Sequence, residues 1–358
     1  MTLVKMAPPN KTLKGHKLIL TDARDLPSDA LSRLHASFPD LQVQPFDAEA
    51  ADIWKNATLA LGTSRNLPTM AQARKLELFQ LTSAGADGLS GQPIFDDTEI
   101  SFCTASGVHG PQISEWVVST FLAFQHRLPE YLGNQQQGQW KISKNPTDDS
   151  VGQRVQISRG ILGYGSVGRQ VARVCKAMGM TVHAYTLHPR RTPGSRRDDS
   201  YAPPGLGDPS GDLPDRWFAG GSTAELHAFL GSGLDLLVVA LPLTARTRGL
   251  IAGPELEVLR ARRAFLSNVG RGPIVRTADL MDALERGVIR GAALDVTDPE
   301  PLPDGHPLWH AKNVIITPHV SGATSKYMER VFEVLMANLT RLSNGERLMN
   351  LISRKEGY

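Results

Sequence analysis

The sequence predicts an α/β protein built from two doubly wound parallel sheets. Its 358 residues exceed what one ordinary hydrophobic core holds, which indicates two domains. Short apolar segments alternate with helical segments twice along the chain, in residues 17–104 and again in residues 159–318. Because strands that alternate with helices pair in parallel and are covered by those helices, each block predicts one sheet.

The first block contains five expected strands, at residues 17–21, 41–45, 58–62, 78–82 and 100–104. A long and mostly apolar helix is expected at residues 112–127, after the Gly110-Pro111 breaker. The stretch 133–153 is rich in Gln, Asn and Asp, and it predicts a linker or surface loop.

The second block contains six expected strands, at residues 160–163, 181–186, 235–241, 264–269, 292–296 and 314–317. Six is the number in a complete doubly wound dinucleotide-binding sheet. Residues 192–221 are rich in Gly, Pro, Asp and Arg and predict a loop inserted after the second of these strands. A last helix, at residues 325–342, is expected to return to the first domain.

Composition and charge exclude several classes of protein. The formal net charge of +3 is too small to indicate a nucleic-acid partner. No apolar run approaches the roughly 20 residues that cross a bilayer, and residues 1–16 lack the apolar segment of a secretory signal. The two cysteines, Cys103 and Cys175, give neither a disulfide framework nor a metal-binding pattern. We therefore expect a cytoplasmic protein with no membrane, nucleic-acid or metal partner.

A GxGxxG sequence formed by Gly163, Gly165 and Gly168 lies between an expected strand and an expected helix. In that context the first glycine permits a tight turn, the second lets a pyrophosphate approach the backbone, and the third packs helix on strand. The alternative is a tight turn without a ligand. The pattern predicts a dinucleotide cofactor, and the residues expected to contact it here are Gly163, Tyr164, Gly165, Ser166 and Val167.

The end of the next strand indicates which dinucleotide is bound. A carboxylate that holds the ribose hydroxyls of NAD is usual there, but this chain has Thr186, followed by Arg190 and Arg191. Guanidinium groups can bind a 2′-phosphate through paired hydrogen bonds, so NADP is expected in preference to NAD. The alternative is a solvated basic loop.

Arg271, Glu300 and His319 each follow a short apolar strand, so all three are expected at the carboxyl edge of the sheet, where ligands of such sheets bind. Arginine can hold the carboxylate and carbonyl oxygen of a 2-oxo acid. Histidine can exchange a proton with that oxygen, and glutamate can orient the imidazole. Each residue alone is more simply explained as a surface, turn or loop residue, but together they predict a catalytic set.

These segments, as a set, resemble the D-isomer-specific 2-hydroxyacid dehydrogenases. The matching stretches are GILGYGSVGRQVARV, ALPLTARTRGLI, FLSNVGRGPIV, GAALDVTDPEPLP and VIITPHVSG, in the family's order, and LTSAGADGL in the first domain. The resemblance implies a Rossmann-like cofactor domain, residues 125–322, inserted in a split flavodoxin-like substrate domain, residues 1–124 and 323–358. It further implies a homodimer. The stretch around Arg190 is most similar to that of the NADP-using glyoxylate and hydroxypyruvate reductases.

By the same resemblance, Arg271, Glu300 and His319 would be catalytic. The backbone amides of Ser83, Ala84 and Gly85 would bind the substrate carboxylate together with Arg271. Asp295 would meet the nicotinamide carboxamide. The remaining residues that would lie along the cofactor are Pro242, Thr247, Val269 and Ser321.

One departure from the family concerns residues 156–159, the sequence Gln-Ile-Ser-Arg, which intervene before Gly160. A central parallel strand is buried on both faces, so Arg159 would place a charge where the family has an apolar residue. Either the four residues bulge out ahead of the strand, or the cofactor domain is damaged.

The resemblance leaves the substrate and physiological direction open. It also leaves an alternative function, because corepressor relatives that sense NAD(H) without significant turnover can retain the three catalytic residues. Formate or phosphite oxidation is a further alternative within the class, disfavoured because formate dehydrogenases carry Gln where Glu300 stands.

Overall fold

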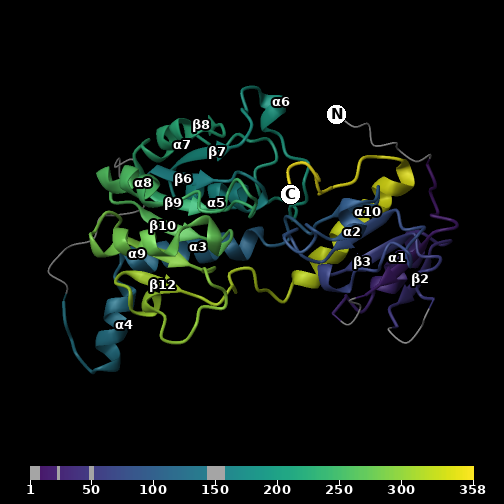
Figure 1. The fold of residues 1–358 in the computed structure, drawn as a ribbon, viewed down its shortest axis with the longest axis horizontal. Helices are drawn as coiled ribbons and strands as arrows, with labels where there is room; N and C mark the ends of the chain where they lie inside the picture. The colour runs from purple at the N-terminus through teal and green to yellow at the C-terminus, as the bar shows by residue number, and fades with distance from the viewer. Residues whose placement is uncertain (1–8, 22–24, 48–51, 143–157) are drawn as a thin grey trace. The chain divides into compact units, whose positions relative to one another are not determined.

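The computed structural model describes residues 9–21, 25–47, 52–142 and 158–358 (Figure 1). The chain divides by its contacts into two compact units. The first comprises Met1–His109, Asp199–Pro203 and Thr324–Tyr358, and the second Gly110–Asp198 and Pro204–Ala323. Helix α3 (Gly110–Gln125) belongs to the second unit by its contacts, because it packs against α5 (Ser166–Ala177). The expected domain boundaries at residues 124 and 323 stay a prediction.

The first unit contains a parallel five-stranded sheet in the order β2-β1-β3-β4-β5. Its strands are β1 (Lys17–Leu20), β2 (Gln42–Pro45), β3 (Leu59–Gly62), β4 (Leu78–Leu81) and β5 (Ser101–Cys103). Helices α1 (Ala30–Ser37) and α10 (Tyr327–Asn344) share a buried cluster on one face, and α2 (Pro93–Asp96) packs in a separate cluster with Phe79 and Phe102. All five expected strands are confirmed, because apolar runs such as Leu59–Gly62 are buried on both faces.

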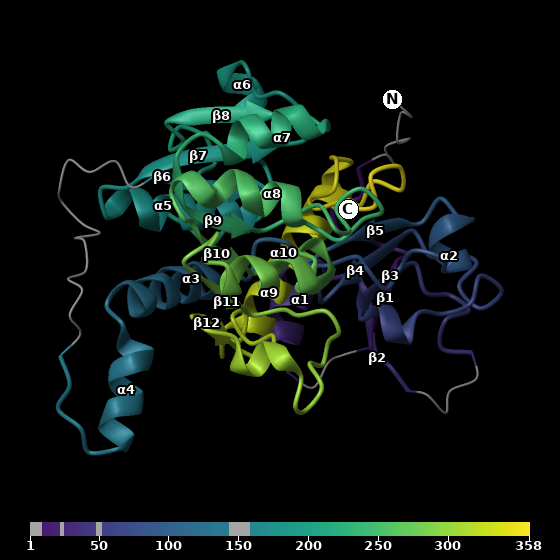
Figure 2. The same ribbon diagram turned by 60° about the vertical axis from the view of Figure 1, so that its left-hand side comes forward.

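The second unit contains a parallel sheet of seven strands in the order β12-β11-β10-β9-β6-β7-β8. They are β6 (Ser158–Leu162), β7 (Thr181–Thr186), β8 (Arg216–Ala219), β9 (Leu234–Val239), β10 (Phe265–Asn268), β11 (Gly291–Leu294) and β12 (Val314–Ile316). The helices are α3, α4 (Leu128–Gln136), α5, α6 (Pro193–Arg196), α7 (Thr223–Leu230), α8 (Gly253–Val258) and α9 (Thr277–Glu285). Helices α7, α8 and α9 bury one face of the sheet, and α3 and α5 bury the other (Figures 1 and 2). The doubly wound fold is therefore confirmed.

Strand β8 corrects the prediction that residues 192–221 form a loop throughout. Its residues Arg216–Ala219 pair in parallel with His183–Thr186 of β7 at the edge of the sheet. The aromatic residues Trp217 and Phe218 favour a strand, but the four residues are short and only partly buried, and the Gly- and Pro-rich sequence around them hid the signal. The second sheet accordingly has one strand more than expected.

The backbone of Ser158 and Arg159 belongs to strand β6, where these residues pair with Thr181 and Val182. Opposite β9 the register shifts between Ser158 and Arg159, so that one residue of β9 is left out of the ladder. These two residues therefore open the strand and do not bulge out ahead of it, while residues 156 and 157 lie outside the described residues. From Gly160 onward the pairing with both neighbours is regular.

The chain order of the second sheet reverses at β6, which lies between β7 and β9. From β6, the next strands in the chain, β7 and β8, lie toward one edge of the sheet. Strands β9, β10, β11 and β12 then follow one another toward the opposite edge. Ligands of doubly wound sheets bind at the carboxyl ends of the strands beside such a reversal. Among the described residues, no helix is both long and apolar enough to span a membrane.

Candidate active site

Glu300 and His319 form a hydrogen-bonded pair at the carboxyl edge of the seven-stranded sheet. Glu300 follows β11, and His319 follows the neighbouring strand β12. The Nδ1 atom of His319 lies 2.6 Å from Oε1 of Glu300, and both side chains are exposed, at 50% and 38%. The hydrogen bond expected from the sequence is thus present, and it leaves Nε2 as the imidazole nitrogen available to a substrate.

The backbone of His319 has a φ of +54°, in the left-handed region that non-glycine residues rarely adopt. Such a conformation persists only where the surroundings hold it. Here the carbonyl oxygen of Asp295 accepts from the N–H of His319 at 2.8 Å. Just downstream, the Asp295 carboxylate accepts from the N–H groups of Val320 and Ser321 at 2.9 and 3.0 Å. Asp295 therefore fixes the loop that aims the imidazole.

Asp295 is 2% exposed, and both of its carboxylate oxygens have partners within this loop. Oδ1 accepts from the Thr317 hydroxyl at 2.6 Å, and Oδ2 from the Ser321 hydroxyl at 2.5 Å. The positions assigned to the cofactor by the resemblance, Asp295 and Ser321, thus serve the His319 loop in this structure. A contact of either with nicotinamide stays a prediction.

Arg271 lies three residues beyond β10, in a turn that Asn268 holds at both ends. The Asn268 amide donates to the carbonyl of Arg271 at 3.1 Å, and its oxygen accepts from the N–H of Gly270 at 3.1 Å. The half-buried Arg271 side chain donates from Nη1 to the Gly270 carbonyl at 2.8 Å. A Cβ atom on Gly272 would come within 1.8 Å of the Thr297 carbonyl oxygen. Only glycine at position 272 lets the Arg271 turn approach the segment that leads to Glu300. Neither the role of Asn268 nor this close approach was predicted from the sequence.

The three glycines of the GxGxxG turn have the environments that a dinucleotide requires. Gly163, at φ +103°, would place a Cβ 2.7 Å from the Ala240 carbonyl oxygen, and Gly168 would place one 2.3 Å from the carbonyl oxygen of Gly163. Gly165 is the N-cap of α5, is exposed, and faces open space, with no atom within 4 Å of a Cβ position. The first and third glycines therefore close the turn, while the second leaves room beside a helix N-terminus for a phosphate.

The two arginines that follow β7 have different surroundings. Arg190 donates from Nη1 to the carbonyl of Ser195 at 2.6 Å, inside a turn closed by the Thr192–Ser195 capping box. Arg191 is exposed and forms no hydrogen bond or ion pair with any residue that the structure describes. The Thr186 hydroxyl donates to the carbonyl of His188 at 2.8 Å. Arg190 thus supports its own loop, and Arg191 is the guanidinium open to a ligand.

The remaining cofactor positions lie on the neighbouring strand ends. The Thr247 hydroxyl donates to the carbonyl of Pro242 at 2.7 Å and closes the loop after β9. Val269 directly follows β10, and its N–H donates to the Val239 carbonyl at 3.1 Å. Ser166 and Val167 open α5. These positions therefore line the edge at which the chain order reverses.

In the first unit, Ser83, Ala84 and Gly85 form a bend after β4. The Ser83 hydroxyl donates to the Gly85 carbonyl at 2.8 Å, and the Tyr327 hydroxyl donates to the carbonyl of the preceding Thr82 at 2.5 Å. Within the described ranges, none of the three backbone N–H groups of this bend donates a hydrogen bond. They are available to an anionic ligand.

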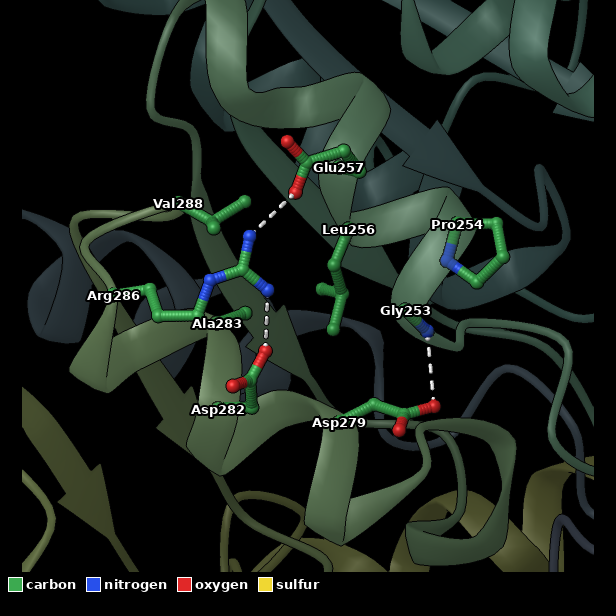
Figure 3. A pocket seen from close by; sticks show the side chains of 9 residues that line it. All are labelled: Gly253, Pro254, Leu256, Glu257, Asp279, Asp282, Ala283, Arg286 and Val288. Atoms are coloured by element: carbon green, nitrogen blue, oxygen red, sulfur yellow. Dashed lines mark hydrogen bonds and ion pairs between the residues drawn. The ribbon is translucent and has the colours of Figure 1, made fainter.

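A cavity of about 280 Å³ between α8 and α9 contains none of these residues (Figure 3). Its charged side chains are paired: Arg286 contacts Asp282 at 2.7 Å and Glu257 at 3.4 Å. Asp279 accepts from the N–H of Gly253 at 2.9 Å. Across the described part of the chain, no group of three or more His, Cys, Asp or Glu residues is arranged to hold a metal ion.

A doubly wound sheet with an open GxGxxG turn and a His–Glu pair at the same edge defines a dinucleotide-dependent oxidoreductase. Residues 118–202 and 216–321, more than half of the chain, match the D-isomer specific 2-hydroxyacid dehydrogenase family, NAD binding domain. The protein belongs to this family of NAD(P)-dependent oxidoreductases.

Relatives of the chain agree with this assignment. A glyoxylate/hydroxypyruvate reductase A of Salmonella newport is 30% identical over 294 residues, which cover 81% of this chain and 84% of the relative. A D-isomer specific 2-hydroxyacid dehydrogenase of Xanthobacter autotrophicus Py2, solved with NADPH and MES, is 29% identical with a TM-score of 0.73, over 96% of this chain and all of that one. A family member from Aeromonas salmonicida is 28% identical with a TM-score of 0.72, over 95% of this chain and 99% of that one.

Proposed function

We propose that the protein transfers a hydride between NADP(H) and a 2-oxo acid or D-2-hydroxy acid, in the manner of a glyoxylate/hydroxypyruvate reductase. The observation that carries the proposal is the Glu300–His319 pair on the carboxyl edge that also holds the open Gly165 turn. The names of the Salmonella relative and the NADPH-bound Xanthobacter structure support the substrate class and the cofactor. NAD(H) is the alternative cofactor, so NADH is tested beside NADPH.

The glycine turn, Gly163 to Gly168, would hold the cofactor, which would supply the hydride that reduces C2 of the substrate. His319 donates a proton from Nε2 to the C2 oxygen as negative charge develops there. Glu300 accepts from Nδ1–H, which fixes the imidazole tautomer and stabilises the imidazolium. Arg271 binds the substrate carboxylate and the polarised carbonyl oxygen. In the first unit, the N–H groups of residues 83–85 are proposed to bind a substrate carboxylate, as the family resemblance implies.

The test is oxidation of NADPH or NADH by purified protein with 2-oxo acids from glyoxylate and hydroxypyruvate to phenylpyruvate, followed by absorbance. We expect consumption of NADPH that depends on the 2-oxo acid. Binding of either cofactor by folded protein without consumption of any 2-oxo acid would contradict the proposal and favour a sensor function.

The exposed Arg191 is expected to bind the 2′-phosphate of NADP. Replacement by serine should raise the KM for NADPH roughly tenfold or more, because a charge-assisted contact with the 2′-phosphate is lost. The KM for NADH should stay within about twofold of wild type, because NADH has no 2′-phosphate. The matched control is Arg197→Ser, which removes one charge from an exposed position of the same basic stretch. Equal effects of the two substitutions on the KM for NADPH would mean that the stretch acts only as a solvated basic loop.

We also propose that two copies associate through α4 and the segment after it. Both views show α4 standing apart from the sheet of its own unit (Figures 1 and 2). None of its residues is buried, and its apolar side chains continue into exposed residues beyond the helix. The exposed apolar side chains are Leu128, Tyr131, Leu132, Trp140 and Ile142. An apolar surface of this kind is typical of a protein interface.

The dimer predicts that Leu132→Lys shifts the mass measured by light scattering from two chains to one at micromolar concentration. Burying a lysine in an interface has a large desolvation cost. Glu130→Gln changes the net charge of the helix by the same amount at an exposed position on the opposite face of α4, so it should remain dimeric. A wild-type protein of monomeric mass would contradict the proposal.

A further inference from the structure

The segment that follows α6 folds onto the glycine turn and onto α5. Residues 203–215 lie outside the two stretches that match the family. The N–H of Gly207 donates to Gln170 Oε1 at 2.7 Å, and Arg173 donates to the carbonyl of Gly205 at 3.2 Å. Arg169 donates to the carbonyl of Asp208. Residues 204–215, here called the insertion, are therefore fixed along α5, the helix that begins at the glycine turn.

Asp208 is the polar centre of the insertion. Its side chain is 5% exposed. Oδ1 accepts from the N–H groups of Gly211 and Asp212 at 3.1 and 3.0 Å, and Oδ2 accepts from the N–H of Leu213 at 3.2 Å. A buried carboxylate with this many donors is held in one position. The insertion thus has a defined shape around a single charged group.

The fourth donor to Asp208 is Tyr164, the residue between the first two glycines of the turn. Its hydroxyl donates to Oδ2 at 2.7 Å, and its side chain is 4% exposed. The ring meets Trp217 edge-on at 5.0 Å, and the guanidinium of Arg169 lies over it at 5.0 Å. Burial and the hydrogen bond to the Asp208 carboxylate raise the pKa of Tyr164 well above its usual range, so the hydroxyl keeps its proton and donates near neutral pH.

Tyr164 is the only residue between Gly163 and Gly165, and neither glycine has a side chain that could hold the turn. The backbone at this point must stay open for the pyrophosphate. A turn that also samples closed conformations binds its ligand more weakly, in proportion to the fraction that is open. The hydrogen bond to Asp208 is therefore placed to keep the turn in its open form.

We propose that Tyr164 and Asp208 are a positioning pair through which the insertion holds the glycine turn ready for NADP(H). The inference rests on the proposed function for its ligand, and neither residue takes part in the transfer of hydride or proton. Cofactor binding and the order of the insertion are then coupled: each stabilises the other.

The first test is the dissociation constant of NADPH, measured by its fluorescence on binding, for wild type and Tyr164→Phe. We expect the dissociation constant to rise about tenfold in Tyr164→Phe, because one hydrogen bond to a carboxylate is lost. The kcat at saturating NADPH should stay within about twofold of wild type. The matched control is Tyr185→Phe, because Tyr185 is also buried and donates only to a backbone carbonyl, that of Gly220 at 3.1 Å. It should bind NADPH as wild type does.

A double-mutant cycle separates a pair from two independent structural residues. Asp208→Ala combined with Tyr164→Phe should bind NADPH no more weakly than Asp208→Ala alone, because alanine has already removed the contact that phenylalanine removes. Multiplying effects would overturn the pairing. If Asp208→Ala does not fold, the comparison of Tyr164→Phe with Tyr185→Phe decides alone.

Hydrogen exchange at the amides of Gly211, Asp212 and Leu213 tests the reciprocal effect, the stabilisation of the insertion by NADPH. NADPH should slow their exchange in wild type and have a smaller effect in Tyr164→Phe at saturation. Equal protection in both proteins, or a dissociation constant unchanged by Tyr164→Phe, would overturn the proposal. A wild type that binds no NADPH would instead contradict the proposed function itself.

Discussion

Replacing His319 by asparagine is expected to lower kcat for 2-oxo acid reduction by about 10² to 10⁴, the usual contribution of a positioned general acid. The imidazole is held by Glu300 at 2.6 Å, and the Asp295 carbonyl fixes its backbone. Asparagine removes the imidazole and leaves a polar side chain at the exposed position. Steady-state rates at saturating NADPH and 2-oxo acid measure the effect.

The control for this substitution is His310→Asn, which replaces an exposed histidine of the short helix at Pro307–His310. It should leave kcat within about twofold of wild type. The dissociation constant of NADPH should be unchanged in both variants. A His319→Asn protein that turns over within tenfold of wild type would remove His319 from the proposed mechanism.

Replacing Arg271 by alanine is expected to lower kcat/KM for the 2-oxo acid by about 10² to 10³, because the developing oxyanion loses a charged donor. Arg271→Lys should recover only part of this loss, since lysine keeps the charge but lacks the planar fork. The turn held by Asn268 and Gly272 keeps its backbone in either variant. Initial rates over a range of 2-oxo acid concentrations separate KM from kcat.

Arg276→Ala provides the comparison. This arginine lies five residues beyond Arg271, is mostly exposed, and pairs with Asp279 at 3.4 Å, so its loss should leave kcat/KM within about twofold. If Arg271→Ala and Arg276→Ala behaved alike, Arg271 would be a surface residue, the alternative that the sequence alone favours for a single arginine.

The sequence predicted the parts of the fold in which one strong pattern determines the structure. Four consecutive buried apolar residues end strand β9, with Leu237 and Val239 in the cluster on one face and Leu236 and Val238 in the cluster on the other. Such a run predicts a central strand whatever surrounds it. Strand β8 has no such pattern, because an edge strand of four half-exposed residues is defined by its pairing with β7 and not by its own burial.

The candidate site shows the same division. Glu300 and His319 could be predicted to meet because each follows a strand, and neighbouring parallel strands end at one edge. The hydrogen-bond partners of Asp295 could not be predicted from the sequence, because these hydrogen bonds depend on the left-handed turn at His319. The contact of Asp208 with Tyr164 joins residues 44 positions apart across an insertion with no regular pattern. Long-range side-chain contacts of this kind follow from the packed fold alone.

The proposed reaction is hydride transfer from NADPH to C2 of a 2-oxo acid to give the D-hydroxy acid. It is tested most directly with NADPH carrying deuterium at the transferred position of nicotinamide C4 and hydroxypyruvate as acceptor. Mass spectrometry and chiral chromatography of the product then report the label and the configuration. We expect one deuterium at C2 of D-glycerate, and no product from His319→Asn on the same time scale. An unlabelled product, the L-isomer, or no product from wild-type protein shown to bind NADPH would contradict it.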